Sequence, residues 1–510
     1  MMQQTNKTPH PYQQRDIELI LAQLQNLQPN SRLLYQLPTG GGKTLVFSEI
    51  AKKFHETSGG KVAILTHRVE LCKQTATVLK NRGLKTSVIT SSKKVKSGAN
   101  DCMVAMVETL KNRIKEKKIK TGDVRLVIID EAHHNSFRKL LASFKNAIVI
   151  GVTATPFSSD IAVPMKKTYD ALITGENIQA LIDGGFLAKP KSVVYEVELN
   201  SLKKGIHGDY TVSSSNELYS TPAMLSLLLE AYQNNAKGKK TLIFNNGIES
   251  SVQVCEKFTE AGIPIKHLDN KTTPEDRKEI LKWFRKTKGA VLTSVSILTT
   301  GFDEPTVQAV ILNRATTSLT LYHQMIGRGS RVMPSKKSFT IIDLGNNIQR
   351  FGEWQQPLDW KYIFEHPEAF AEQLQYAGNG AASHSHAISS DMRAQFPNTL
   401  EMTFDVEGHY EDVVAHGLKP KRVIQQSLRQ HAMMCIENGA TLSDALALTE
   451  VLAPEIEWRV NQYTKCIDKA TKNYKAWLLE DYKQRLSRFV RKIHYLKEHK
   501  EMSTTETVGS

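Results

Sequence analysis

The stretch that most restricts the fold of this chain is LPTGGGKT, at residues 37–44. It follows an apolar run at 33–35 and precedes another at 45–47. Glycines allow successive backbone N–H groups to converge on one anion, and a helix that begins there points its positive end at that anion. We therefore predict a site for a nucleoside triphosphate, with Lys43 on the β- and γ-phosphates and Thr44 on Mg²⁺.

One position of this stretch departs from the usual phosphate-binding loop. Leu37 stands where the pattern GxxxxGK[ST] has its first glycine. The alternative interpretation is a glycine turn followed by a chance lysine. On the first interpretation, the loop holds the nucleotide through Thr39, Gly40, Gly41 and Gly42.

The composition indicates a polyanionic partner and a reducing compartment. The 510 residues carry a formal net charge of +15, although a soluble basic protein without such a partner is the alternative. The five cysteines are far apart and form no CxxC pair, which argues against a disulfide framework or a zinc ribbon. No apolar run suits a signal peptide or a membrane span, so we expect a cytoplasmic protein.

Short apolar runs alternate with segments of helical period between residues 31 and 155. This alternation predicts an α/β fold built on a parallel sheet. The predicted strands are 33–36, 62–66, 88–90, 103–106, 126–130 and 148–153. Ligands of such sheets bind at the carboxyl ends of the strands, where each of these runs stops in polar residues.

The sequence DEAH, at residues 130–133, follows one of these strands directly. A carboxylate at a strand end can hold Mg²⁺, and a second one beside it can deprotonate the water that attacks the γ-phosphate. We assign the metal to Asp130 and the general base to Glu131. The alternative is that these are ordinary acidic residues in the turn that follows a strand.

Two other strand ends carry hydroxyl and basic side chains. They are Thr66-His67-Arg68 and Thr153-Ala154-Thr155. These groups can contact backbone phosphates or relay the nucleotide state between sites, but helix capping by threonine is an equally good interpretation.

Residues 157–238 lack a clear alternating pattern, so we place a domain junction there. Alternation resumes at 242–244, 263–266, 290–293, 309–312 and 339–344, which predicts a second parallel sheet without a phosphate loop. After it, LYHQMIGRGSRV holds Arg328 and Arg331 three residues apart. They share one face if a helix continues through Gly327 to Gly329, and an arginine on a γ-phosphate neutralises charge during transfer. Exposed, salt-bridged arginines are the alternative.

The motifs LPTGGGKT, ILTHRVELCKQ, IIDEAH, GVTATP, LIFNN, LTTGFDEP and QMIGRGSR resemble, in this order, those of superfamily 2 helicases of the DEAD/DEAH-box type. The similarity covers residues 10–350 and is greatest to the RadD-like and XPB-like bacterial DNA helicases, through SVSILTTGFDEPTV, SLTLYHQMIGRGSRV and IIDLGNN. It implies two tandem RecA-like lobes, with ATP between them and nucleic acid running across both. RadD carries a cysteine-rich zinc module after its core, whereas this chain has only Cys435 and Cys466 there.

The resemblance also implies roles for single residues. It implies that Gln13 reads the adenine edge, that Gln324 lies near the γ-phosphate, and that Arg328 and Arg331 act as arginine fingers. The other implied residues are Gly301 and Asp303 on the nucleotide, Thr66, Arg68, Thr109, Asn245 and Thr299 on the nucleic-acid strand, and Thr153 and Thr155 in coupling hydrolysis to motion.

Charges separate in the last third of the chain. Acids outnumber bases in residues 401–457, whereas residues 459–500 hold twelve bases and four acids. This part contains a helical apolar stripe made of Tyr474, Trp477, Leu478, Tyr482, Leu486, Phe489, Ile493 and Leu496. It is either an accessory region that clamps duplex or branched nucleic acid, or a stripe that packs as core.

These patterns predict five regions and one activity. The regions are lobe 1 with the ATP site at 1–165, a connector at 166–235, lobe 2 at 236–352, an extension and linker at 353–399, and a mostly helical accessory region at 400–510. The predicted activity is that of an ATP- and Mg²⁺-dependent DNA helicase or translocase in repair or recombination. An RNA helicase and a nucleic-acid-binding module without hydrolysis are the alternatives.

Overall fold

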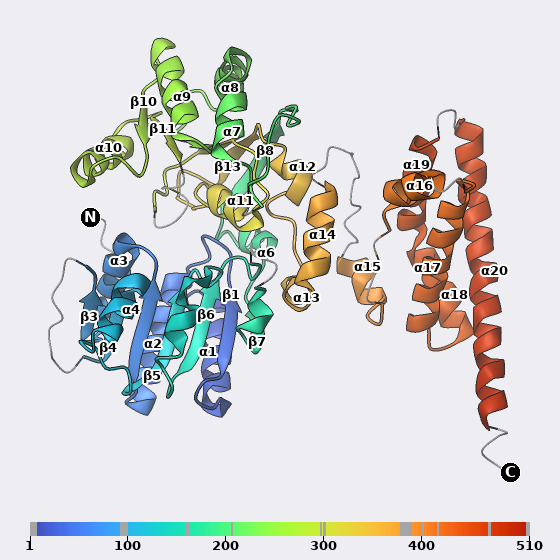
Figure 1. The fold of residues 1–510 in the computed structure, drawn as a ribbon, viewed down its shortest axis with the longest axis horizontal. Coiled ribbons are helices and arrows are strands. Elements are labelled where there is room, and N and C mark those ends of the chain that lie inside the picture. Colours follow the sequence, from blue (N-terminus) through green and yellow to red (C-terminus); the bar gives the residue numbers. More distant parts are fainter. Residues whose placement is uncertain are drawn as a thin grey trace. The chain divides into compact units, whose positions relative to one another are not determined.

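The computed structural model describes residues 8–91, 100–158, 163–205, 208–295, 298, 302–377, 390–399, 402, 404–415, 418–467 and 471–505. The chain divides into an N-terminal unit, Met1–Leu374, and a C-terminal unit, Gln375–Ser510. The N-terminal unit contains two parallel sheets, and the described part of the C-terminal unit is helical (Figure 1). The predicted α/β class, with tandem parallel-sheet lobes and a helical C-terminal region, is confirmed.

Lobe 1 is built on a seven-stranded sheet in the order β3-β4-β2-β5-β6-β1-β7. Its strands are β1 (Arg32–Gln36), β2 (Lys61–Thr66), β3 (Thr86–Ile89), β4 (Cys102–Met106), β5 (Val124–Asp130), β6 (Ile148–Thr153) and β7 (Ala171–Thr174). Its helices are α1 (Pro11–Asn26), α2 (Lys43–Ser58), α3 (Val69–Asn81), α4 (Val107–Lys115) and α5 (Arg138–Leu141).

Lobe 2 is built on a six-stranded sheet in the order β10-β11-β9-β12-β13-β8. Its strands are β8 (Lys189–Val194), β9 (Thr241–Asn245), β10 (Ile265–Leu268), β11 (Val291–Val295), β12 (Ala309–Asn313) and β13 (Ser338–Asp343). Helix α6 (Ile178–Asp183) precedes this sheet, and α7 (Val212–Tyr219), α8 (Pro222–Asn235), α9 (Ile248–Glu260), α10 (Pro274–Lys286) and α11 (Leu319–Ile326) connect its strands. Helices α12 (Asn347–Phe351), α13 (Trp360–Glu365) and α14 (Pro367–Ala377) follow.

Alternating side chains of the lobe 1 strands pack on opposite faces of the sheet. Leu33 and Tyr35 belong to the core beneath α1 and α2, whereas Leu34, between them, belongs to the core on the other face. Both faces are covered, so the strands are apolar along their whole length, which is why the sequence shows them as continuous runs. Lobe 2 repeats this arrangement, with Phe244 and Ile243 of β9 in different cores.

Strands β7 and β8 lie within residues 166–235, where the sequence analysis placed no strand. Each is the last strand at one edge of its sheet. Edge strands are short or carry charge and proline, so their apolar pattern is weak. Strand β8 illustrates this, because Pro190 lies between Lys189 and Lys191.

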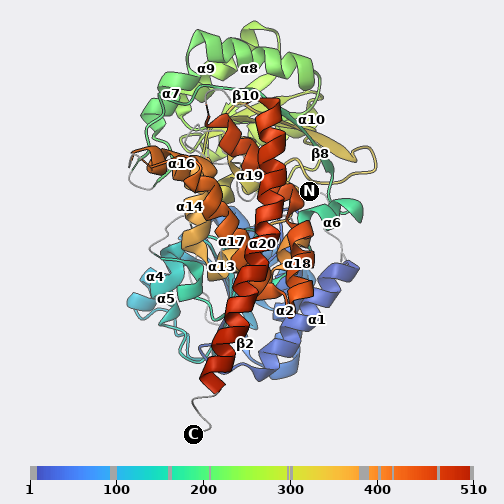
Figure 2. The same ribbon diagram turned by 90° about the vertical axis from the view of Figure 1, so that its right-hand side faces the viewer.

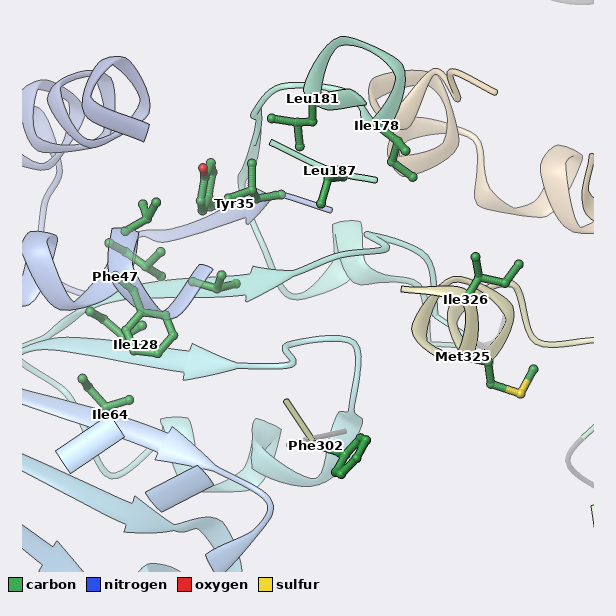
Figure 3. Close-up of a cluster of buried hydrophobic side chains, with 14 of the residues drawn as sticks. Tyr35, Phe47, Ile64, Ile128, Ile178, Leu181, Leu187, Phe302, Met325 and Ile326 are labelled. Atoms are coloured by element: carbon green, nitrogen blue, oxygen red, sulfur yellow. The ribbon is translucent and has the colours of Figure 1, made fainter. Parts of the chain in front are cut away.

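The two lobes share one hydrophobic cluster. Phe47 and Ile128 of lobe 1 belong to the same cluster as Met325 and Ile326 of α11 in lobe 2. Figure 3 shows these side chains together with Leu187, from the segment that joins the lobes. Apolar contact therefore supports the polar contacts between the lobes that are described below.

The C-terminal unit is a bundle in which α20 runs along several shorter helices (Figure 2). Its helices are α15 (Ser390–Gln395), α16 (Val406–Ala415), α17 (Arg422–Asn438), α18 (Leu442–Val451), α19 (Ala453–Lys465) and α20 (Lys472–Thr505). Leu478, Tyr482 and Leu486 of the predicted stripe are buried in its core, whereas Trp477 is 58% exposed. Residues 378–389 of the predicted linker lie outside the described residues. Among the described residues, no helix has the length and apolar content to cross a bilayer.

A polar network lies inside this bundle. Arg459 is fully buried and donates to Glu455 Oε1 at 2.8 Å and to the carbonyl oxygen of Met402 at 2.8 Å. His431 Nδ1 lies 2.9 Å from the hydroxyl of Tyr482, and its Nε2 atom has no hydrogen-bond partner. Burial, with a contribution from the charge of Arg459, holds the pKa of His431 well below its usual value.

We expect the C-terminal unit to lose stability as the pH falls from 7 to 5. Below pH 6.5, the usual pKa of histidine, His431 binds a proton in the unfolded chain but not in the folded state. The free energy of unfolding therefore falls by about 1.4 kcal/mol per pH unit in this range. Hydrogen exchange of α17 and α20 amides in the full chain, corrected for intrinsic rates, measures this loss. The variant His431→Gln should show a smaller loss, and an equal loss in both proteins would contradict the assignment.

Candidate active site

The glycine-rich loop at 37–42 joins the end of β1 to the start of α2. Gly40 and Gly42 have φ angles of 100° and 87°, a left-handed conformation that glycine adopts without strain. Leu37 is fully buried, and a Cβ added to Gly41 would lie 2.9 Å from its Cγ atom. Leu37 therefore forms the floor of the loop, which explains why a large apolar residue is compatible with this position.

Lys43 begins α2 and directs its amine into the loop. Its Nζ atom donates to the carbonyl oxygen of Leu37 at 3.3 Å. Burial lowers the pKa of Lys43, and the negative charges of Glu131 and Asp130 oppose this effect. The amine is thus within electrostatic reach of both carboxylates, and Thr44 follows it in the first turn of the helix.

Asp130 ends β5, and Glu131 follows in a turn. The φ angle of Glu131 is 54°, which is uncommon for a residue with a Cβ and is often associated with functional sites. Burial and the charge of Glu131 raise the pKa of Asp130. The pKa of Glu131 is lowered, because burial is outweighed by nearby positive charges, Lys43 foremost. Its Oε2 atom is buried without a hydrogen-bond partner, so it can accept a proton from a water molecule.

His133 connects Glu131 to the end of β6. Its Nδ1 atom lies 3.5 Å from Glu131 Oε2 and 3.1 Å from Thr153 Oγ1. The Thr153 hydroxyl donates to the carbonyl oxygen of Thr155 at 3.0 Å, so its hydrogen is used and Nδ1 of His133 is the donor. Burial lowers the pKa of His133 to about 3, which keeps the ring neutral near pH 7.

Lobe 2 contacts two of these lobe 1 residues, Thr155 and His133. Thr155 Oγ1 lies 2.7 Å from Thr320 Oγ1 of α11. Gln324, one turn further along α11, places its Nε2 amide 3.4 Å from His133 Nε2, which accepts the hydrogen because Nδ1 carries the ring proton. Both predicted coupling threonines, Thr153 and Thr155, thus lie between Glu131 and lobe 2.

The two arginines come together without the helix that the sequence analysis assumed. Helix α11 ends at Ile326, so the condition of a helix through 327–329 was wrong. Glycine is a poor helix former, and here Gly329 packs so closely on Phe339 that an added Cβ would overlap its ring. Arg328 therefore lies in a turn, and Arg331 follows it in a β-bridge with Leu187.

Arg328 and Arg331 lie on the lobe 2 side of the glycine-rich loop. Arg328 Nη1 donates to the carbonyl oxygen of Phe302 at 2.7 Å, and Arg331 Nε donates to Asp303 Oδ1 at 2.9 Å. Burial and the charge of Arg331 lower the pKa of Arg328 to about 10, while Glu131 opposes that shift. Arg328 is therefore close enough to the Glu131 carboxylate to interact with it.

The lobes touch directly at the loop. A Cβ added to Gly40 would lie 2.8 Å from Ser330 Oγ and 3.0 Å from Arg331 Nη1. A Cβ added to Gly327 would lie 2.7 Å from Thr39 Cβ. These two glycines allow the two lobes to approach each other closely, a requirement that no sequence spacing reveals.

Gln13, which is buried, contacts the glycine-rich loop. Its Nε2 atom donates to the carbonyl oxygen of Gly41 at 2.7 Å, and Tyr12 donates to the same oxygen at 2.9 Å. The rings of His10, Tyr12 and Phe186 lie against one another, with centroids 4.7 to 5.9 Å apart. This aromatic group, which the sequence analysis did not identify, borders the loop on the side where the resemblance places the adenine.

The residues predicted to contact a nucleic-acid strand differ in accessibility. Thr66 and Asn245 are fully buried, and Asn245 is held by Thr293 at 2.8 Å and by Asn313 at 2.7 Å. Arg68 and Thr109 are partly exposed, at the start of α3 and in α4. The remaining strand residue, Thr299, lies outside the described residues, as does Gly301, which was predicted to contact the nucleotide.

Sequence reasoning missed Asp209, which lies in the segment before α7. Its carboxylate accepts from Thr316 Oγ1 and from the backbone N–H of Thr317, both at 2.8 Å, and pairs with Arg314 at 3.3 Å. These partners directly precede α11, so Asp209 fixes the start of the helix that carries Thr320. His133 and Thr320 were also missed. Only the DEAH motif, whose last letter is His133, gave a signal.

Two family models match the chain. Residues 6–158 match the model described as type III restriction enzyme, res subunit, and residues 222–333 match the helicase conserved C-terminal domain. A 51.5 kDa protein of a Lactococcus phage is 30% identical over 65% of this chain and 70% of the relative. IRC3 of Saccharomyces cerevisiae, assigned by name to the ATP-dependent helicases, is 32% identical over 65% of this chain. The chain spans only 50% of the length of IRC3.

Solved structures show the same fold at low sequence identity. A fragment of a type I restriction enzyme HsdR subunit from Vibrio vulnificus matches with a TM-score of 0.55 and 23% identity, over 68% of this chain and 66% of the fragment. The restriction-modification enzyme LlaBIII, bound to DNA, matches with a TM-score of 0.52 and 15% identity, over 95% of this chain and 41% of that enzyme. Dbp5 of Saccharomyces cerevisiae, bound to RNA, matches with a TM-score of 0.50 and 18% identity, over 72% of this chain and 94% of Dbp5.

Proposed function

Because this chain belongs to the superfamily 2 helicases and hydrolyses ATP, we propose that it is a DNA helicase or translocase stimulated by nucleic acid. The observation that carries the proposed catalytic site is that Arg331 of lobe 2 lies against the loop at Gly40, with Lys43 and Glu131 of lobe 1 within electrostatic reach of Arg328. A role in DNA repair or recombination is part of this proposal. Membership of the RadD-like and XPB-like subgroup stays a prediction from the motifs.

Each charged group of the cleft has one task in the proposed reaction. Lys43 binds the β- and γ-phosphates, together with the backbone of residues 39–42. Glu131 accepts the proton of the attacking water, which its lowered pKa permits because the carboxylate is ionised near pH 7. Arg328 and Arg331 neutralise the charge that develops on the γ-phosphate, and Gln324 and Asp303 orient this side of the cleft.

The oxygen donors of the cleft fit Mg²⁺. The raised pKa of the buried Asp130 carboxyl marks a charge without sufficient compensation, which a cation would supply. Asp130 and the hydroxyl of Thr44 would hold the ion, and Mg²⁺ bound there neutralises phosphate charge.

Hydrolysis and motion are coupled, in this proposal, through the contacts between the lobes. Loss of the γ-phosphate releases Arg328 and Gln324. Because Gln324 contacts His133 and His133 lies beside Glu131, movement of Gln324 changes the surroundings of the general base Glu131. Thr155 and Thr320 keep the lobes in register while the cleft is closed. Opening and closing then alternate the grip of the two lobes on the strand, which moves the protein along it.

We expect Thr320→Val to uncouple these events. Valine keeps the shape of threonine but removes the hydroxyl that meets Thr155. Basal ATP hydrolysis should fall less than about fivefold, because a neutral hydrogen bond is worth about 1 kcal/mol, while the stimulation by nucleic acid should fall more. Thr317→Val, a neighbour that contacts Asp209 instead, is the matched control. Equal stimulation in Thr320→Val and wild type would reject the coupling role.

DNA is the proposed substrate because of the names of the relatives. The family model for residues 6–158 is that of a restriction enzyme subunit, and the LlaBIII structure with this fold holds DNA. The alternative is RNA, because Dbp5 with the same lobes was solved with RNA. The lobes of either class contact mainly the backbone, so the 2′-OH decides between the two.

An ATPase titration tests the substrate. Hydrolysis is measured with single-stranded DNA, duplex DNA, forked DNA and RNA of equal length, with Lys43→Ala as the inactive control. DNA should raise the rate at lower concentration than RNA does. Stronger stimulation by RNA would reject the DNA proposal, and full activity of Lys43→Ala would reject the proposed ATP site.

A further inference from the structure

Helix α20 presents a second row of side chains, outside the core of the C-terminal unit. The members follow at intervals of three and four residues, so they lie on one side of the helix. They are Tyr474, Trp477, Asp481, Arg485, Arg488, Lys492 and Tyr495, and we call this row the aromatic-basic stripe. The core residues Tyr482 and Leu486 lie on a different side and are fully buried.

The aromatic end of the stripe is exposed and ordered by its own contacts. Trp477 is 58% exposed and Tyr474 36% exposed. Their rings are stacked, with centroids 5.9 Å apart and an angle of 28° between the planes. Tyr474 also adjoins the buried Tyr463 of α19. Two stacked and exposed rings offer a flat apolar face to a partner.

The charge of the stripe identifies the partner. The stripe holds Arg485, Arg488 and Lys492, and its one acidic residue, Asp481, is paired with Arg485 at 3.5 Å. A partner helix would need apolar positions along the whole row, whereas here the middle of the row is basic. Aromatic rings next to positive charge are the combination that binds single-stranded nucleic acid. The nucleobases stack on the rings, and the phosphates pair with lysine and arginine side chains.

We propose that the aromatic-basic stripe of α20 binds single-stranded nucleic acid, with a base stacked on Trp477 and phosphates paired with Arg488 and Lys492. The stripe spans about 30 Å at the helical rise of 1.5 Å per residue, long enough for several nucleotides. The proposal extends the proposed function, because it gives the C-terminal unit its own contact with the strand, separate from the ATP cleft.

The affinity of the full chain for single-stranded nucleic acid, measured without ATP, tests whether the aromatic-basic stripe binds it. Fluorescence anisotropy with a labelled single-stranded oligothymidine and with a blunt duplex of equal length gives the Kd values. Trp477→Ala should weaken single-strand binding about tenfold, since stacking contributes about 1–3 kcal/mol per base, and should leave duplex binding unchanged. Trp477→Phe should retain most of the affinity. Oligouridine in place of oligothymidine separates RNA from DNA binding.

A matched pair of lysines on the same helix tests the charges. Lys492 belongs to the stripe, and Lys483, nine residues earlier and also exposed, lies on the opposite side of α20. Lys492→Ala should weaken single-strand binding. It should also reduce the slope of the logarithm of the affinity against the logarithm of the salt concentration by slightly less than one unit, while Lys483→Ala should do neither. Equal effects of the two variants, or unchanged binding by Trp477→Ala, would overturn the stripe. Nucleic-acid-stimulated ATP hydrolysis, measured at saturating strand in the same variants, reports on the proposed function separately.

Discussion

Glu131→Gln is expected to lower the kcat of ATP hydrolysis about a thousandfold, with ATP bound as in the wild type. Glutamine keeps the size of the side chain but cannot accept a proton from the attacking water. The buried Oε2 atom without a hydrogen-bond partner is the place where that water binds in our proposal. Single-turnover hydrolysis gives the rate, and titration with a fluorescent ATP analogue gives the affinity.

The companion variants make this result specific. Lys43→Ala removes the amine that faces both carboxylates, so it should weaken ATP binding as well as hydrolysis. Glu108→Gln, at an exposed position of α4, should behave as wild type. A rate in Glu131→Gln within tenfold of the wild-type rate would show that another group takes the proton.

Arg328→Ala is expected to have the second large effect, a loss of about a thousandfold in kcat. Arg328 is the lobe 2 group whose charge reaches Glu131, and it lies on the far wall of the cleft from Lys43. Without it, the charge that builds up on the γ-phosphate has no neutralising partner in that position. Arg328→Lys should stay impaired, because an ammonium cannot form the forked contact of a guanidinium.

Two other arginines of lobe 2 separate this effect from a general loss of charge. Arg331 is paired with Asp303 and adjoins Gly40, so Arg331→Ala should disturb the loop and raise KM in addition to lowering kcat. Arg285 lies on α10, pairs with Glu304 and has its side chain 56% exposed, so Arg285→Ala should leave both constants within about twofold. If Arg328→Ala and Arg285→Ala hydrolyse ATP equally fast, the opposing wall of the cleft is not part of the catalytic site.

Local sequence predicted the parts of the fold whose chemistry is local. Central strands such as β1, β5 and β9 are buried on both faces, so each appears as an apolar run. Edge strands β7 and β8 were missed, because an edge needs less apolar surface and tolerates proline and charge. The assumed helix beyond Ile326 was wrong for a similar reason, since packing against Phe339 decides how the chain continues there.

The sequence by itself determined which chemical groups each strand end carries: a glycine loop with Lys43, a carboxylate pair at Asp130 and Glu131, and two arginines far along the chain. Only the tertiary structure decided which of them meet. Thr155 and Thr320 are 165 residues apart and touch, and no pattern along the chain records that distance. The physical reason is that helical and strand periods are set by near neighbours, whereas the cleft is set by two separately folded sheets that share one apolar interface.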